Sequence, residues 1–256
     1  MSRILLHELH GGAVARLVLN APKGNVLDGA MIAEITWAAR ELASRQRLRA
    51  VVLEGEGLHF SYGTAVQEHY GERAAEMLAG FHGMLYALLE LGTPLVAKVR
   101  GYCLGGGLEL AALCHFLICD RTARFGQPEA KLGVFAPAAS LLLPMRVGQT
   151  KADELLLTGA TLDADEALAC GLVTTLADWD GLDTAVERFL EQRLLPLSAS
   201  SLRHAARAAR WSFEQTMRAE LPRLEKRYLE QLMATHDATE GLNAFLEKRE
   251  PRWSHD

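Results

Sequence analysis

Residues 95–113 read LVAKVRGYCLGGGLELAAL and join an apolar strand to an apolar helix through three consecutive glycines. Glycine has no Cβ, so the backbone of residues 105–107 can approach a ligand closely. The N–H groups of this loop would lie at the start of the helix, where the helix dipole favours a developing oxyanion. A glycine triplet alone can also be a tight turn without a ligand, so its meaning depends on its neighbours.

A second glycine loop, FSYGTA at residues 60–65, follows an apolar strand at residues 50–53. Two such loops after two adjacent strands would aim two backbone N–H groups at one point, as an oxyanion hole requires. Neither loop has the spacing of a Walker motif or of a dinucleotide fingerprint, so phosphate binding is disfavoured. Together the loops favour stabilisation of a negatively charged oxygen.

Two glutamates accompany the glycine loops. Glu109 follows the triplet closely, and Glu129 closes the sequence FGQPE at residues 125–129. The apolar neighbours of Glu109 favour its burial, which would raise its pKa toward the range useful for proton transfer. Taken alone, Glu109 could instead lie on a helix surface and Glu129 at the exposed start of a short helix. As a pair that converges on the loops, they would move water's protons in an enzyme that forms and quenches an enolate.

The composition excludes several classes of protein. The chain has 256 residues, 49% of them hydrophobic and 23% charged, which is ordinary for a globular domain. The net charge is −5 and there is no basic block, so nucleic acid is not expected as a partner. No apolar run approaches the roughly 18 residues of a membrane span, and no secretory signal opens the chain. We therefore expect a cytoplasmic protein that does not associate with membranes.

The cysteines and histidines form no metal-binding pattern. The four cysteines show neither zinc-site spacing nor a disulfide framework, so we expect buried thiols in a reducing compartment. The nine histidines are scattered, and a structural or solvent-facing role is favoured for each. His69 is of most interest because it borders the second glycine loop. No metal site is predicted.

The order of elements indicates an α/β fold, because short strands alternate with helices through the first half of the chain. Strands are expected at residues 14–19, 50–53, 95–99, 115–119 and 173–176, and helices near residues 30–44, 77–88 and 108–113. Asp163 and Glu166 fit a capping box, with Gly171 at the end of that helix.

The last sixty residues are expected to be wholly helical. Ser198 is a candidate N-cap, a long helix over residues 213–233 would be interrupted by Pro222, and another would cover residues 238–248. We predict a core with the active site at residues 1–195 and a C-terminal helical oligomerisation region at residues 196–256. The latter is too charged to form its own core and would pack on the core or on neighbouring subunits.

The segments at residues 101–110 and 125–129 together strongly resemble the crotonase (enoyl-CoA hydratase/isomerase) superfamily, and the likeness extends over nearly the whole chain. The resemblance implies a crotonase-like spiral of β-β-α turns with a C-terminal helical trimerisation region, hence a homotrimer or a dimer of trimers. It also implies an acyl-CoA thioester substrate. CoA would be part of that substrate, and no separate cofactor is expected.

The same resemblance assigns roles to individual residues. Glu109 and Glu129 match the two catalytic glutamates of the family's hydratases, and the N–H groups of Thr64 and Gly106 match the oxyanion hole. Retention of both glutamates favours hydration over the other activities of the superfamily. Further residues would contact the CoA or acyl part of the substrate, namely Lys23, Val26, Thr64, Ala65, Val66, Gln67, Gly106 and Phe135.

One segment departs from ordinary enoyl-CoA hydratases. Residues 134–140 read VFAPAAS where those enzymes carry a Pro-Gly pair, so Pro137 removes a backbone donor and Phe135 adds a ring near the acyl pocket. The segment resembles that of dienoyl-CoA hydratases of anaerobic benzoyl-CoA breakdown, which hydrate cyclohexa-1,5-diene-1-carbonyl-CoA to 6-hydroxycyclohex-1-ene-1-carbonyl-CoA. The alternatives are a general short-chain enoyl-CoA hydratase and a non-catalytic acyl-CoA-binding protein.

Overall fold

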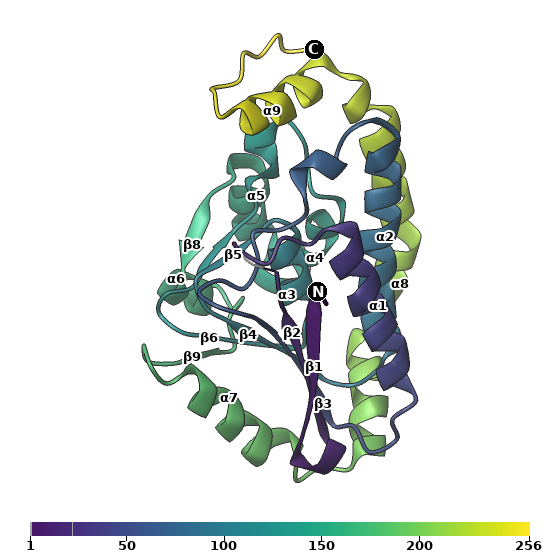
Figure 1. Ribbon diagram of the computed structural model, residues 1–256, viewed down its shortest axis with the longest axis vertical. Coiled ribbons are helices and arrows are strands. Elements are labelled where there is room, and N and C mark those ends of the chain that lie inside the picture. The colour runs from purple at the N-terminus through teal and green to yellow at the C-terminus, as the bar shows by residue number, and fades with distance from the viewer. Residues whose placement is uncertain (1, 22) are drawn as a thin grey trace.

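The computed structural model describes residues 2–21 and 23–256. Within these residues six strands form one sheet in the order β1-β2-β3-β4-β6-β9 (Figure 1). The strand β1 is antiparallel to β2, and every other neighbouring pair is parallel. The strands are β1 (Ile4–Leu9), β2 (Val14–Leu19), β3 (Ala50–Gly55), β4 (Leu95–Val99), β6 (Phe116–Cys119) and β9 (Thr175–Leu176).

A second, smaller sheet contains β5 (Tyr102–Leu104), β7 (Arg124–Gly126) and β8 (Thr161–Asp163), in that order. The strand β5 follows β4 after a turn at Gly101, whose φ of 55° is favoured by glycine. The chain then enters α3 (Gly106–Leu113), and β6, β7 and the 3₁₀ turn η3 (Pro128–Leu132) repeat the same path. These two successive turns of the chain each contribute one strand to each sheet and then a helical segment, as expected of the predicted spiral.

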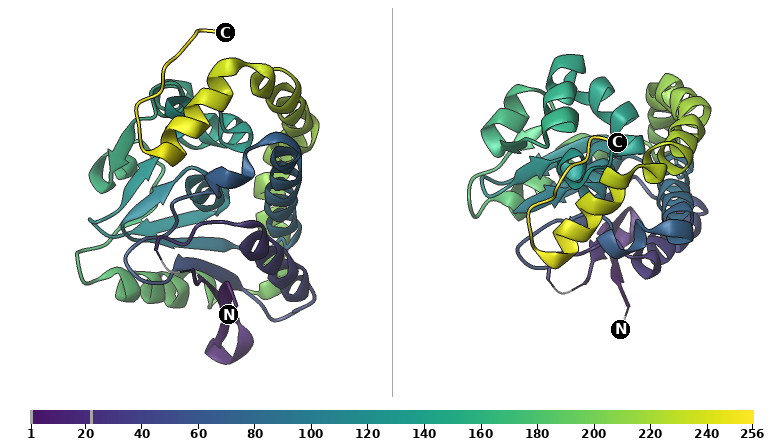
Figure 2. Two further views of the ribbon diagram at one scale, coloured as in Figure 1. Left: turned by 45° about the horizontal axis from the view of Figure 1, so that its top comes forward. Right: turned by 90° about the horizontal axis from the view of Figure 1, so that it is seen from above.

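Helices cover both faces of the large sheet. Side chains alternate along its strands, so Val52 and Val96 pack with Val186 in one cluster beneath α7, while Leu53 and Ala97 face the main core. On the other side, α1, α2 and α8 run as a column along the edge of the molecule (Figures 1 and 2). The helices are α1 (Gly29–Ala43), α2 (Gly71–Glu90), α3, α4 (Pro137–Val147), α5 (Gln149–Thr158), α6 (Ala164–Ala169), α7 (Leu182–Phe189), α8 (Ala199–Glu230) and α9 (His236–Glu247).

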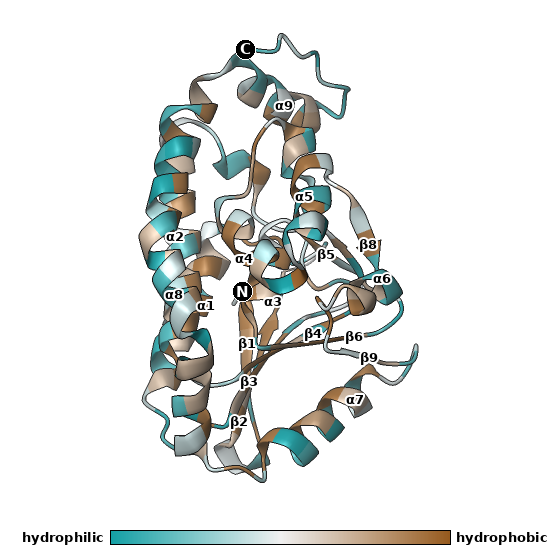
Figure 3. Ribbon diagram, turned by 180° about the vertical axis from the view of Figure 1, so that it is seen from behind, coloured by the Kyte–Doolittle hydropathy of each residue, from teal (hydrophilic) through white to brown (hydrophobic). Residues whose placement is uncertain are grey.

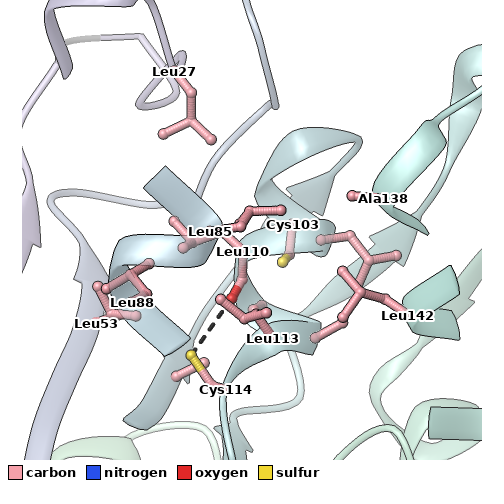
Figure 4. Close-up of a cluster of buried hydrophobic side chains, with 14 of the residues drawn as sticks. Leu27, Leu53, Leu85, Leu88, Cys103, Leu110, Leu113, Cys114, Ala138 and Leu142 are labelled. Carbon is pink, nitrogen blue, oxygen red and sulfur yellow. Dashed lines mark hydrogen bonds between the residues drawn. The ribbon is translucent and has the colours of Figure 1, made fainter. Parts of the chain in front are cut away.

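The main core is aliphatic and includes the thiols. Cys103 and Cys114 lie among leucine side chains, and the Cys114 thiol points to the Leu110 carbonyl oxygen at 3.5 Å (Figure 4). All four cysteines are free, and Cys170 alone is partly exposed. The prediction of buried thiols is therefore confirmed for Cys103, Cys114 and Cys119 but not for Cys170. Figure 3 shows the distribution of hydropathy over the whole fold, with hydrophobic residues along the strands of the large sheet and mixed hydrophobic and hydrophilic residues on the outer helices.

Local capping signals are confirmed. The Asp163 side chain accepts a hydrogen bond from the Glu166 amide at 2.9 Å, and the Glu166 carboxylate accepts one from the Asp163 amide at 2.9 Å. Gly171 follows this helix with a φ of 82°. The Ser198 side chain caps α8 by accepting a hydrogen bond from Ser201 N at 3.4 Å. These signals act over a few residues, so they are readable from sequence.

The predicted interruption at Pro222 is wrong, because α8 continues from Ala199 to Glu230. Proline removes one N–H hydrogen bond, and that loss does not end a helix whose apolar face is fixed by packing on both sides. Here Met217 and Leu221 are fully buried before or beside the proline, and Tyr228 is buried beyond it. The helix packs along α2 and α4, and none of the described helices is long and apolar enough to span a membrane.

Candidate active site

The spiral brings the predicted site residues together by register. Ser61 pairs with Cys103 in a parallel bridge, and Cys103 pairs with Phe125 in the small sheet. Three residues further along each segment stand Thr64, Gly106 and Pro128, so the ends of three successive turns lie side by side. Glu129 follows directly on the third of them.

The two glycine loops touch each other closely. A Cβ atom on Gly63 would lie 2.8 Å from the Leu104 carbonyl oxygen and 3.1 Å from the Gly106 nitrogen. Gly63 also has a φ of 96°, and Gly105 has a φ of 51° with a ψ of −129°, a conformation open to glycine. Any larger residue at 63 would push the loops apart.

Two backbone donors are available where the loops meet. Gly106 is the first residue of α3, so its N–H has no partner within the helix. Among the described residues, neither the Gly106 N–H nor the Thr64 N–H donates a hydrogen bond to another protein atom. Two free amides beside a helix N-terminus can stabilise an oxyanion.

These loops line a cavity of about 510 Å³, a size suited to a small molecule. Apolar side chains of η3 and the following loop, Leu132 and Val134, form one wall, and Leu242 and Phe245 of α9 form another. Hollows of about 610 and 710 Å³ occur elsewhere on the surface, but neither contains a glycine loop or a glutamate of the pair. The cavity combines an apolar wall with the free amides and Glu129.

Glu109 lies in the first turn of α3, is 5% exposed and, unlike Glu129, is not among the residues that line this cavity. Its Oε1 accepts a hydrogen bond from Ala139 N at 2.7 Å, in the first turn of α4. Burial raises the pKa of Glu109, whereas the nearby His82 and the α4 amides of Ala139 and Ala138 act to lower it. The helix N-terminus therefore supports the ionised carboxylate.

Glu129 has a different environment. Its Oε1 accepts one hydrogen bond, from Gln127 Nε2 at 3.1 Å, and its buried Oε2 has no partner among the described residues. Burial raises the pKa of Glu129 to about 8, and the charge of Glu109 adds to this effect. The two carboxyl groups titrate as a coupled pair in which Glu129 more readily keeps a proton at neutral pH.

The other predicted contact residues fall into two groups. Those that line the cavity with Glu129 are Val26, Thr64, Ala65, Val66, Gln67 and Gly106. Lys23 lines a neighbouring hollow of about 570 Å³, and Tyr62 borders both spaces. Phe135 packs its ring against Tyr228, with 5.4 Å between centroids, and is not among the described lining residues.

Several residues near the site were not predicted. His69 lines the cavity, and its only sequence signal was its place beside the second loop. Tyr228, Leu242 and Phe245 come from α8 and α9, more than a hundred residues away from either loop, so no local pattern indicated them. The site therefore draws on both sides of the predicted division at residue 195. A potential metal-ligand group of His236, Asp237 and Asp256 occurs in the described residues, but none of its members lines the cavity.

Comparison with known proteins agrees with this geometry. The family model for enoyl-CoA hydratase/isomerase matches residues 10–256. The chain belongs to the enoyl-CoA hydratase/isomerase family. It is 47% identical over 244 residues to cyclohexa-1,5-dienecarbonyl-CoA hydratase of Thauera aromatica. The aligned residues cover 95% of this chain and 94% of the relative. It is 38% identical to a probable enoyl-CoA hydratase of Mycobacterium tuberculosis, over 94% of this chain and 95% of that one.

Solved structures of the enoyl-CoA hydratase/isomerase family share the fold. A crystal structure of an enoyl-CoA hydratase from Mycobacterium avium superposes with a TM-score of 0.88 at 27% identity, covering 99% of this chain and 100% of the other. The crotonase-type α/β fold is thus confirmed, and the chain is an enzyme of the enoyl-CoA hydratase type. Assembly into trimers stays a prediction.

Proposed function

We propose that the enzyme hydrates cyclohexa-1,5-diene-1-carbonyl-CoA to 6-hydroxycyclohex-1-ene-1-carbonyl-CoA, a step of anaerobic benzoyl-CoA breakdown in the cytoplasm. The observation that carries the choice of substrate is the 47% identity, over 95% of the chain, to a hydratase named for that substrate. The 38% identity to a probable enoyl-CoA hydratase supports the same chemistry with a less defined substrate.

The thioester oxygen would accept hydrogen bonds from the N–H groups of Thr64 and Gly106, with CoA along residues 64–67 and near Lys23 and Val26. The ring would occupy the apolar end of the cavity, beside Leu132 and Val134. A flat hydrocarbon ring suits this lining because it offers no polar group that would be left unpaired. CoA is part of the substrate, and the proposed reaction uses no other cofactor and no metal.

The two carboxyl groups would take opposite roles. Ionised Glu109, held by the α4 amides, removes a proton from water as the water oxygen bonds to the β carbon. The electrons of the double bond move to the thioester oxygen, and the resulting dienolate is stabilised by the two backbone amides. Protonated Glu129 then donates its proton to the far end of the dienolate. One water is consumed, and a proton passed from Glu109 to Glu129 restores the starting state.

A product assay tests this proposal. The enzyme is incubated with the cyclic diene thioester and, separately, with crotonyl-CoA, and both kcat/KM values are measured on the same preparation. We expect a clear preference for the cyclic diene and formation of the 6-hydroxy product. Comparable activity on crotonyl-CoA would indicate a general short-chain enoyl-CoA hydratase. Tight acyl-CoA binding without turnover would indicate a non-catalytic binding protein.

A further inference from the structure

A hydrogen-bonded chain of three side chains links the oxyanion loop to the C-terminal helix α8. The His69 Nε2 atom lies 3.1 Å from Thr64 Oγ1, and its Nδ1 lies 2.9 Å from the Tyr228 hydroxyl. Tyr228 is 1% exposed, and His69 lies at the cavity wall. The chain therefore joins a predicted oxyanion-hole residue to a position 164 residues further along the sequence.

The protonation states of the three groups decide which atom donates. Burial lowers the pKa of His69 to about 4, so its ring is neutral at neutral pH. Burial and the charges of Glu129 and Glu109 raise the pKa of Tyr228, so its hydroxyl keeps its proton. Among the described residues, His69 Nδ1 is the one hydrogen-bond partner of that hydroxyl. Tyr228 therefore donates to Nδ1, the ring proton lies on Nε2, and Nε2–H donates to Thr64 Oγ1.

This arrangement fixes the side-chain orientation of Thr64. Its methyl carbon Cγ2 faces Gly106, because a Cβ atom built on Gly106 would lie 2.9 Å from it. The hydroxyl is thereby held on the side of His69. A Thr64 side chain freed from His69 could rotate and place its hydroxyl oxygen near the Gly106 N–H, where it would compete with the substrate oxygen for that donor.

We propose that His69 and Tyr228 are positioning residues that hold the Thr64 hydroxyl away from the Gly106 amide, and so keep the oxyanion hole open. The inference rests on the proposed function, since it assumes that the two amides bind a thioester oxygen. Both residues act through Thr64, which His69 contacts directly and Tyr228 reaches through His69. Phe135, in the segment 134–140 that departs from ordinary hydratases, packs its ring against Tyr228 and so contacts the same group of side chains.

The first test is spectroscopic and needs no substrate. In the ¹⁵N-histidine-labelled enzyme, the ring nitrogens of His69 should report the Nε2–H tautomer between about pH 6 and 8. In Tyr228→Phe the donor to Nδ1 is lost, so the ring should become a mixture of tautomers. A His69 ring in the Nδ1–H form in the wild-type enzyme would overturn the proposal.

The second test is kinetic. Misplacement of a group by about 1 Å can cost on the order of 100-fold in rate, so we expect Tyr228→Phe to lower kcat by about 10- to 100-fold with little change in KM. Tyr86→Phe is a matched control, because its hydroxyl also tethers α8, by donating to Met217 O at 3.1 Å, without contact to His69. Tyr86→Phe should stay within about twofold of wild type. Equal effects of the two substitutions would reduce Tyr228 to a structural tether.

A double-substitution cycle shows whether the effect passes through Thr64. Valine at 64 has the shape of threonine but no hydroxyl, so it cannot compete for the Gly106 amide. Tyr228→Phe should therefore lose most of its effect in a Thr64→Val background, whereas additive losses would contradict the proposal. If the wild-type enzyme turned over neither acyl-CoA, the proposed function would fail, and the tautomer measurement would still decide the state of His69.

Discussion

Replacement of Glu129 by glutamine tests the assignment of the general acid most directly. The amide keeps the size of the side chain and can still pair with Gln127, but it has no proton to give to a dienolate. Loss of general acid catalysis costs typically 10²- to 10⁴-fold, so kcat should fall by about that factor. The protein should remain folded, because the substitution removes a buried ionisable group and leaves a neutral one of the same shape.

The pH dependence gives a sharper expectation. Glu109 must be ionised and Glu129 protonated, so kcat/KM should rise as Glu109 loses its proton and fall as pH increases through about 8, the pKa of Glu129. The residual activity of Glu129→Gln should lose the fall near pH 8 and keep the rise at lower pH. The measurement is kcat/KM from about pH 5 to pH 10 for both proteins, with the exposed Glu41→Gln as a matched control. It separates the rise at lower pH, due to Glu109, from the fall near pH 8, due to Glu129.

The free energy of unfolding should also depend on the protonation of Glu129, and it can be measured without substrate. The pKa of Glu129 is about 8 in the folded protein against an ordinary value of 4.5, so the folded state holds this proton more tightly than the unfolded state. Stability from this group is therefore highest below about pH 4.5 and declines as pH rises toward 8, by on the order of 5 kcal/mol at most. Urea unfolding should show Glu129→Gln gaining stability relative to wild type between pH 5 and pH 9.

Either of two outcomes would refute this reasoning. Near-wild-type kcat in folded Glu129→Gln would remove the residue from the mechanism. A stability difference between variant and wild type that does not change from pH 5 to pH 9 would show that its carboxyl group is not held protonated by burial.

Three further predictions follow from the site and the C-terminal region. Glu109→Gln should lower kcat by about 10²- to 10⁴-fold and abolish the rise at low pH, and unchanged turnover would exclude it as the base. Deletion from Ser198 onward should give aggregated or monomeric material by light scattering, whereas a soluble, active trimer would contradict the proposed role of residues 196–256. Pro137→Gly with Phe135→Leu should shift the ratio of kcat/KM between the cyclic diene and crotonyl-CoA by roughly 10- to 200-fold, and a shift under about twofold would remove this segment from specificity.

Local sequence patterns predicted the elements that depend on local interactions. The bounds of β2 agree with the expected strand at residues 14–19, since Ala15, Leu17 and Leu19 alternate into the main core and Val14 faces the cluster on the other side of the sheet. The three-residue strands β5 and β7 were not predicted, because such short segments are strands only through their pairing with each other and with β8. The helix through Pro222 was mispredicted for the same reason, since long-range packing outweighed a local breaker.

The candidate site shows the same limit. Glycine loops and carboxylates carry a signal in sequence because the residue type itself is constrained. The different environments of Glu109 and Glu129 carry only part of such a signal. The apolar neighbours of Glu109 and the Gln127 beside Glu129 are local, but the Ala139 amide that holds Glu109 is thirty residues away in the sequence. Identical side chains thus acquire different pKa shifts from elements that only the folded chain brings together.

In the proposed mechanism, the helix α8 would support both the oxyanion loop and Glu109. Tyr228 reaches Thr64 through His69, and three residues earlier Glu225 pairs with the buried His82, which acts to lower the pKa of Glu109. Deletion of residues after Ser198 would therefore remove support for the active site even if subunits still assembled. Loss of activity in the truncated chain cannot by itself report oligomerisation, so light scattering must decide assembly. Single substitutions at Tyr228 and Glu225 must decide the contribution of α8 to catalysis.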